Sequence, residues 1–207
     1  MLAQATPTQN PLPIAPARRL HGYQLALLTL TVVAQLLVAG TTAVLYRHVQ
    51  DLVGELPKTV VAPATLGGRP RTDGTTTDAL IAQVMRGQPT WHGTAEVKAF
   101  YGNPEAGLLL HAVAGSFNWS AGELDYLFYD LRVGGIAVYD VAPVPAGPLG
   151  GQASCGQVSD GTTIVCAWAD PESLGTIVWY GSSLDAARAE FIDLRGEVQV
   201  VKPMSEW

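Results

Sequence analysis

Two cysteines, Cys155 and Cys166, are the residues whose type and spacing most directly indicate chemistry in this chain. Between them lies Asp160-Gly161, a dipeptide typical of a two-residue type I′ hairpin turn, in which both residues need a positive φ. Cys155 lies five residues before this turn and Cys166 five residues after it, so the two face each other across the predicted hairpin. Facing residues have Cα atoms about 4.5–5.5 Å apart, a separation that a disulfide can bridge. We therefore predict a Cys155–Cys166 disulfide, with two separate small core cysteines as the alternative.

The histidines and serines form no recognisable catalytic or metal-binding motif. His111 lies in an apolar stretch and is expected to be a core or surface residue with satisfied hydrogen bonds. The sequence contains no HExxH, no CxxC pair, no calcium-loop pattern and no Gly-x-Ser-x-Gly nucleophile elbow. We therefore predict no metal, no cofactor and no catalytic residue.

With those motifs absent from the sequence, a pair of carboxylates that act as general acid and base is the remaining hypothesis for an enzyme. Asp125 with Asp130, or Glu105 with Glu172, are candidate acid and base pairs. Such a pair needs its carboxyl groups about 5–10 Å apart. Solvated helix faces and turns are the preferred explanation of these four residues.

Aromatic residues are the candidates for a ligand groove. Trp168 and Trp179 are expected to line the core or an apolar groove, and His92, beside Trp91, is expected in an exposed loop. A groove lined by aromatic side chains suits a peptide or another envelope ligand. The candidate groove residues are thus Trp91, His92, Trp168 and Trp179.

The elements that position these residues follow an uncharged stretch from Tyr23 to Tyr46. As a helix this stretch is about 36 Å long, enough to cross a hydrocarbon core of about 30 Å. The preceding Arg18 and Arg19 and the flanking tyrosines predict an uncleaved signal-anchor, with the N-terminus in the cytoplasm and the lipid bilayer as partner. A cleaved signal peptide, with small residues at Val38-Ala-Gly40, is the alternative, but the apolar run exceeds a typical signal core.

The distribution of charge along the chain and the predicted disulfide both favour an acidic domain that is exported from the cytoplasm. Residues 1–46 contain two arginines and no acid, whereas residues 47–207 contain ten basic and eighteen acidic residues. This acidic balance argues against nucleic-acid binding. A structural disulfide persists on the oxidising outer side of a membrane. We therefore expect a single-pass cell-membrane protein whose C-terminal domain is extracytoplasmic.

Composition and periodicity divide the chain into five parts. They are a disordered tail over residues 1–22, the membrane helix over 23–46, a juxtamembrane linker with a short helix over 47–89, an α+β domain over 90–199 and a C-terminal tail over 200–207.

The predicted domain over residues 90–199 alternates strand patterns with two helical patterns. We expect an antiparallel sheet of about six strands with both helices on one face. An Asn/Asp-Pro-Glu turn, a strand and a helix occur twice, around Pro104 and Pro171. The domain can therefore also be interpreted as two β-β-α repeats.

Several short stretches together resemble a known family. They are Tyr101-Gly-Asn-Pro104, Pro148-Leu-Gly-Gly151, Cys155-Gly156, and Cys166-Ala-Trp-Ala-Asp170 with Gly175 after it. Over residues 90–195 the chain resembles a family of uncharacterised single-pass membrane proteins of actinobacteria, streptomycetes in particular. That family continues the last stretch with a histidine where this chain has Pro171, so no role of that histidine carries over. The resemblance implies a membrane-tethered extracytoplasmic domain and no known activity.

The sequence thus predicts a membrane-anchored extracytoplasmic binding or interaction domain of the bacterial cell envelope. Its expected partner is another envelope protein or a small ligand. A cell-envelope hydrolase that uses paired carboxylates is the alternative. A third hypothesis is a transmembrane signalling component whose residues 1–20 touch a cytoplasmic partner.

Overall fold

The computed structural model describes residues 22–54, 57–86, 93–117 and 122–202. The chain divides into two units, residues 1–46 and residues 47–207. Helix α1 (Gly22–Gly54) exposes its described side chains between Leu27 and Leu45. Within the described residues, no helix has both the length and the apolar character needed to cross a membrane. The predicted tail over residues 1–22 lies outside the described residues except for Gly22, the first residue of α1.

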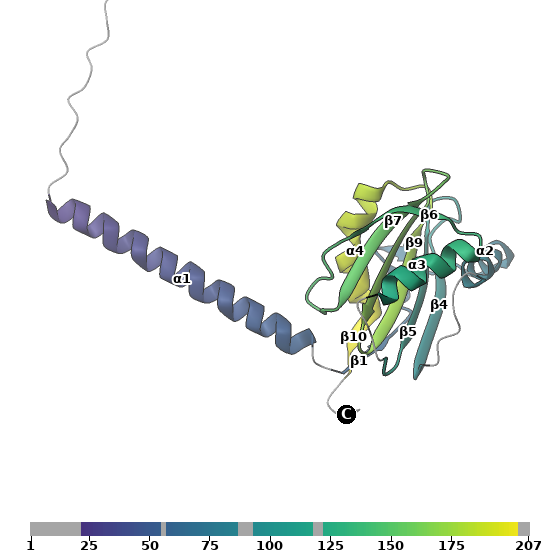
Figure 1. The fold of residues 1–207 in the computed structure, drawn as a ribbon, viewed down its shortest axis with the longest axis horizontal. Helices are drawn as coiled ribbons and strands as arrows, with labels where there is room; N and C mark the ends of the chain where they lie inside the picture. Colours follow the sequence, from purple (N-terminus) through teal and green to yellow (C-terminus); the bar gives the residue numbers. More distant parts are fainter. Residues whose placement is uncertain (1–21, 55–56, 87–92, 118–121, 203–207) are drawn as a thin grey trace, which may run out of the picture. The chain divides into compact units, whose positions relative to one another are not determined.

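The second unit is built on a six-stranded antiparallel sheet (Figure 1). Its strands lie in the order β4-β5-β9-β8-β7-β6. The predicted α+β class and the antiparallel sheet of about six strands are therefore confirmed. The strands are β4 (Ala95–Tyr101), β5 (Leu108–Ala114), β6 (Val138–Pro143), β7 (Gln152–Val158), β8 (Ile164–Asp170) and β9 (Ser173–Trp179).

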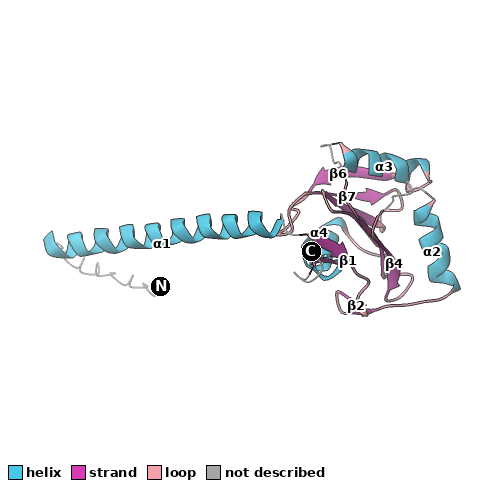
Figure 2. Ribbon diagram, turned by 90° about the horizontal axis from the view of Figure 1, so that it is seen from below, coloured by secondary structure: helices cyan, strands magenta, loops and turns pink. Residues whose placement is uncertain are grey.

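Both faces of this sheet are covered (Figure 2). Helices α2 (Thr75–Met85) and α3 (Glu123–Val133) pack on one face, and helix α4 (Leu184–Val198) packs on the other. The central strands β5, β8 and β9 are buried at every residue. Strands that are apolar at nearly every position need cover on both faces. The prediction that both helices lie on one face is therefore wrong.

The two hairpin-and-helix halves are not arranged as a duplicated sheet would be. Strands β5 and β9 are antiparallel neighbours at the centre of the sheet. A two-fold rotation that exchanges them runs perpendicular to the sheet and keeps both following helices on the same face. Because α3 and α4 lie on opposite faces, two symmetric β-β-α repeats do not describe this domain.

Part of the predicted juxtamembrane linker belongs to the domain. Strand β1 (Lys58–Val60) pairs with β10 (Gln199–Val201), and β2 (Thr65–Leu66) pairs with β3 (Arg69–Pro70). Leu66 is completely buried in the core that contains α4. The short helix expected in this segment is confirmed as α2.

The predicted linker and C-terminal tail are therefore wrong in part. Residues 58–60, 65–66 and 69–70 form strands, and so do residues 200 and 201. These strands are only two or three residues long, too short for an alternating pattern to be recognised in the sequence. Residues 203–207 lie outside the described part of the chain.

The β7–β8 hairpin has the predicted register but a different turn. The Val158 N–H donates to the Thr163 carbonyl at 2.8 Å, and the Gly161 N–H donates to the Val158 carbonyl at 3.0 Å. Gly161 has a φ of 76° but Asp160 does not have a positive φ, so the type I′ prediction is wrong. The Asp160 carboxylate instead accepts hydrogen bonds from the N–H and hydroxyl of Thr163. Aspartate side chains commonly close turns by accepting hydrogen bonds from the backbone that follows.

Candidate functional site

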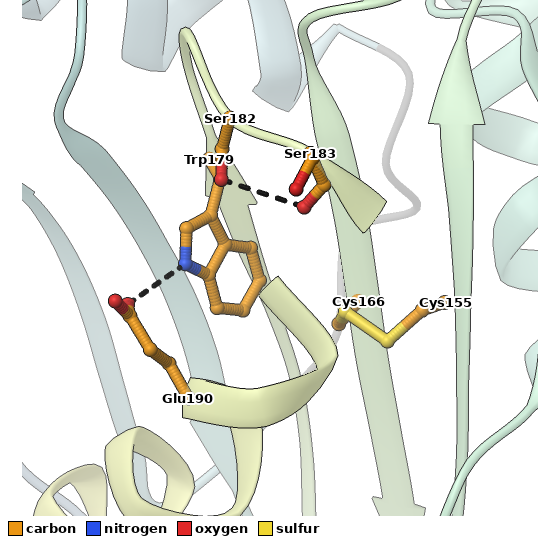
Figure 3. Close-up of a disulfide and its surroundings, with 6 residues drawn as sticks. All are labelled: Cys155, Cys166, Trp179, Ser182, Ser183 and Glu190. Carbon is orange, nitrogen blue, oxygen red and sulfur yellow. Dashed lines mark hydrogen bonds between the residues drawn. A yellow bond between two sulfur atoms is a disulfide. The ribbon is translucent and has the colours of Figure 1, made fainter. Parts of the chain in front are cut away.

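Cys155 and Cys166 form the predicted disulfide (Figure 3). Their Cα atoms lie 4.0 Å apart and both residues are completely buried on the face that α4 covers. Because side chains alternate along a strand, Cys166, Trp168 and Asp170 share this face of β8. These three residues therefore form the side of β8 that faces α4, while Ala167 and Ala169 face α3.

Asp170 is the centre of a buried polar cluster and is only 2% exposed. Its Oδ1 accepts the backbone N–H groups of Glu172 and Ser173, both at 2.9 Å, which closes the turn between β8 and β9. Its Oδ2 accepts the Ser173 hydroxyl at 3.0 Å. The Ser173 hydroxyl in turn accepts the indole N–H of Trp168 at 3.0 Å.

Three more residues bring distant segments to Asp170. Arg195 Nη2 donates to Oδ2 at 3.0 Å, the Gln199 amide donates to the same oxygen, and Lys58 Nζ lies 3.9 Å from Oδ1. Arg195 Nη1 also donates to the Ala146 carbonyl at 2.6 Å. Burial lowers the pKa of Arg195 to about 10, although the Asp170 carboxylate opposes this shift. The cluster therefore joins β1, β10, α4 and the β6–β7 connection to β8.

The geometry of this cluster indicates a structural role. Five donor groups saturate the two oxygens of Asp170, and the guanidinium of Arg195 is fully buried. A catalytic acid or base must instead reach a substrate within hydrogen-bond distance. Sequence reasoning missed Arg195, Lys58 and Gln199. The available signal was an acid at the end of a wholly apolar strand, because a buried charge needs a partner.

Two glycines, Gly175 and Gly151, pack against the same cluster. A Cβ added at Gly175 would lie 2.2 Å from the Trp168 ring. A Cβ added at Gly151, which has a φ of 81°, would lie 2.4 Å from the Ala169 carbonyl oxygen and 2.7 Å from the Asp170 Cβ. Gly175 and Gly151 therefore both contribute to the packing around Trp168 and Asp170.

The two predicted groove tryptophans that the structure describes lie in the core. Trp168 is 0% and Trp179 is 2% exposed, and the Trp179 indole N–H donates to Glu190 Oε2 at 3.3 Å (Figure 3). They form no open groove, because α4 covers the strands that carry them. Trp91 and His92 lie outside the described residues.

His111 is buried within the sheet on β5, next to the edge strand β4. It is 1% exposed, and its Nε2 lies 3.1 Å from Glu96 Oε1 on the neighbouring strand. Burial lowers the pKa of His111 to about 4, although Glu96 opposes the shift. The expectation of a satisfied core histidine agrees with this contact.

Acidification should therefore destabilise the domain through His111. An unfolded histidine takes up a proton near pH 6.5, whereas the folded one resists protonation down to about pH 4. Stability should rise with pH across this window, and about 2 kcal/mol should be lost between pH 7 and pH 5. Urea unfolding at both pH values measures the loss. A His111→Gln variant should show a flatter pH dependence, and an equal loss in that variant would contradict the assignment.

The paired carboxylates are not brought together by the sheet. The register places Ala114 opposite Ser173 and Leu108 opposite Trp179. Glu105 and Glu172 therefore lie beyond opposite ends of a seven-residue strand pair, about 20 Å apart at roughly 3.3 Å per residue. Asp125 and Asp130 lie on α3, five residues apart, and therefore on different sides of the helix.

Pockets open on the part of the domain that the structure describes. One has a volume of about 250 Å³ and includes Lys58, Glu172 and Lys202 in its lining. Another has about 420 Å³ and lies between the start of α3 and the β6–β7 connection; we name it the α3 pocket. The α3 pocket is lined by Leu124, Asp125, Pro143, Val144, Ala146, Gly151, Gln152, Ala153 and Ser154.

Neither metal-ligand geometry nor comparison with known proteins assigns a function to this domain. Across residues 22–54, 57–86, 93–117 and 122–202, no group of three or more His, Cys, Asp and Glu residues is placed to hold a metal ion. Compared with protein families, curated proteins and solved structures, the chain shows no significant match.

Proposed function

We propose that this chain is a membrane-anchored binding protein of the cell envelope, with its folded domain outside the cytoplasm. The observation that carries the proposal is the Cys155–Cys166 disulfide, which is buried at the centre of the sheet. Structural disulfides form and persist in oxidising compartments and are rare in the cytosol. The domain is therefore assigned to the extracytoplasmic side.

The anchor in this proposal is the uncharged stretch from Tyr23 to Tyr46. It lies within α1, and large apolar side chains such as Leu30 and Val44 are 72% and 70% exposed. Contiguous exposed apolar surface favours a lipid or protein partner. The arginines before this stretch and the acidic domain after it favour a cytoplasmic N-terminus.

Binding, rather than hydrolysis, is the activity that we assign to the domain. The Glu105 and Glu172 carboxylates are too far apart to act on one bond. The α3 pocket has the size of a small-ligand site, since such sites are about 300–1,000 Å³. It combines apolar walls with a few polar side chains, the lining that fixes a ligand's orientation.

Cysteine oxidation and protease access test this topology together. In cells lysed under denaturing conditions with excess maleimide, both cysteines should be unlabelled unless a reductant is added first. Protease added to intact spheroplasts should degrade residues 57–207. Mass spectrometry measures the label, and an antibody against a C-terminal tag measures the degradation.

The matched control is a Cys155→Ser/Cys166→Ser variant, which should remain unlabelled with and without reductant. Two free thiols in the unreduced wild-type protein would place the domain in a reducing compartment. Full protection from protease would reverse the orientation. Either result would overturn the proposal.

A further inference from the structure

The α3 pocket lies where β7 begins, and part of its lining comes from the sheet face that α3 covers. On β7, Gln152 pairs with Ala169 and Ser154 pairs with Ala167, and both alanines belong to the core beneath α3. Because paired residues project to the same side of a sheet, Gln152 and Ser154 also face α3. The first turn of α3, with Asp125, forms the opposite wall.

Three polar side chains line this pocket, with Asp125 and Gln152 exposed and Ser154 half-buried. In the part of the chain that the structure describes, Asp125, Gln152 and Ser154 make no side-chain hydrogen bond or ion pair. Protein polar groups in such pockets usually serve to orient a ligand. The three side chains are therefore available to one.

The charge of the α3 pocket is negative. Asp125 is the charged residue among the described residues that line it. Glu123 and Asp125 both lie in the first turn of α3 and together outweigh the partial positive charge of about one half at a helix N-terminus. The remaining walls are mainly apolar, with Leu124, Pro143 and Val144. This combination fits an aliphatic chain that ends in a cation.

We propose that the α3 pocket binds a lysine-like side chain, an aliphatic chain carrying an ammonium group. Asp125 pairs with the ammonium, and the oxygens of Gln152 and Ser154 accept its other hydrogens. Leu124 and Pro143 contact the methylene groups, since a lysine stem packs well on apolar surface. The inference rests on the proposed binding function and names its ligand class.

Exposed tyrosines on α3 favour a peptide as the source of this side chain. Tyr126 and Tyr129 are 66% and 60% exposed. Tyr129 lies four residues after Asp125 on α3, so the two share one side of the helix. Aromatic side chains are favoured contacts in protein interfaces. They offer a surface for the residues that flank the lysine.

Binding of short peptides to the full-length protein in detergent micelles tests the proposal. The probes are acetyl-Gly-Lys-Gly-amide, the same peptide with an acetylated lysine, and free cadaverine. We expect the lysine peptide to bind at least tenfold more tightly than its acetylated form, measured by ligand-observed NMR titration. Tenfold corresponds to about 1.4 kcal/mol.

An Asp125→Asn variant should bind the lysine peptide at least tenfold more weakly. The control is Asp185→Asn, which removes an exposed acid from the first turn of α4 on the other face and should leave binding unchanged. Equal binding of the two peptides, binding of neither, or unchanged binding by Asp125→Asn would overturn the proposal. Cadaverine binding as tightly as the peptide would support the ammonium pocket and overturn its peptide source. The disulfide and protease results do not depend on any of these outcomes.

Discussion

Replacing Asp170 with alanine should destabilise the domain by about 3–5 kcal/mol. The change would leave Arg195, which is 0% exposed, as a buried cation without the carboxylate that it pairs with. Breaking a buried ion pair by removing one partner has a cost of this size, because the remaining charge is uncompensated. Urea unfolding of the full chain in detergent micelles, followed by tryptophan fluorescence, measures the effect. Trp168 is a suitable reporter, since its ring centroid lies 5.8 Å from Arg195.

An exposed ion pair provides the control for Asp170. Asp73 lies 3.4 Å from Arg71 with its side chain 81% exposed. Exposed pairs contribute about 0–1 kcal/mol, so Asp73→Ala should have a small effect. The double variant Asp170→Ala/Arg195→Met should lose less stability than the sum of its two single changes, since it leaves one fewer unpaired charge. Equal urea midpoints for Asp170→Ala and Asp73→Ala would contradict the structural role of the cluster.

The sequence pattern around the turn was enough to predict the β7–β8 hairpin and its disulfide, because both depend on residues close together in the chain. The register of Cys155 and Cys166 follows from their equal distance from one turn, and the disulfide follows from the register. The turn itself was mispredicted, because the choice between two turn types depends on where the Asp160 carboxylate points. An error in the turn did not change the register, since both turns keep the same residues opposite each other.

The contacts that hold the domain together are distant in the sequence. Asp170 and Arg195 are 25 residues apart. Lys58, which also lies near Asp170, belongs to a segment whose composition predicts a linker. No periodicity connects a short strand near the start of the domain with an acid near its end. The placement of α4 was predictable in principle, because β5 is apolar at nearly every position and needs cover on both faces.

Fold-determining and ligand-binding residues are largely separate in this domain. Trp168, Asp170 and Gly175 belong to the packing and hydrogen bonding beside α4. Asp125 and Ser154, which line the α3 pocket, take no part in those contacts. The packing beside α4 therefore carries no information about the proposed ligand, because function resides in the site and not in the fold.

Replacing Gly175 with alanine should destabilise the domain by about 2–3 kcal/mol. Gly175 has no positive φ, so the strand conformation itself accepts alanine. The added Cβ would lie 2.2 Å from Cη2 and Cζ2 of Trp168, and the indole is completely buried with no room to retreat. Overpacking of a core has a cost of this order. The displaced ring would also disturb its hydrogen bond to Ser173 and its contact with Arg195.

Two further variants separate this clash from a general effect of adding a methyl group. Gly196 lies in α4 with nothing within 4 Å of an added Cβ, so Gly196→Ala should stabilise the domain by up to about 1 kcal/mol. Trp168→Phe removes the outer ring atoms that meet the new methyl group. The Gly175→Ala/Trp168→Phe double variant should therefore be more stable than the two single losses predict, by about 1 kcal/mol or more in urea unfolding. Strictly additive losses would show that Gly175 is required for a reason other than its contact with the indole.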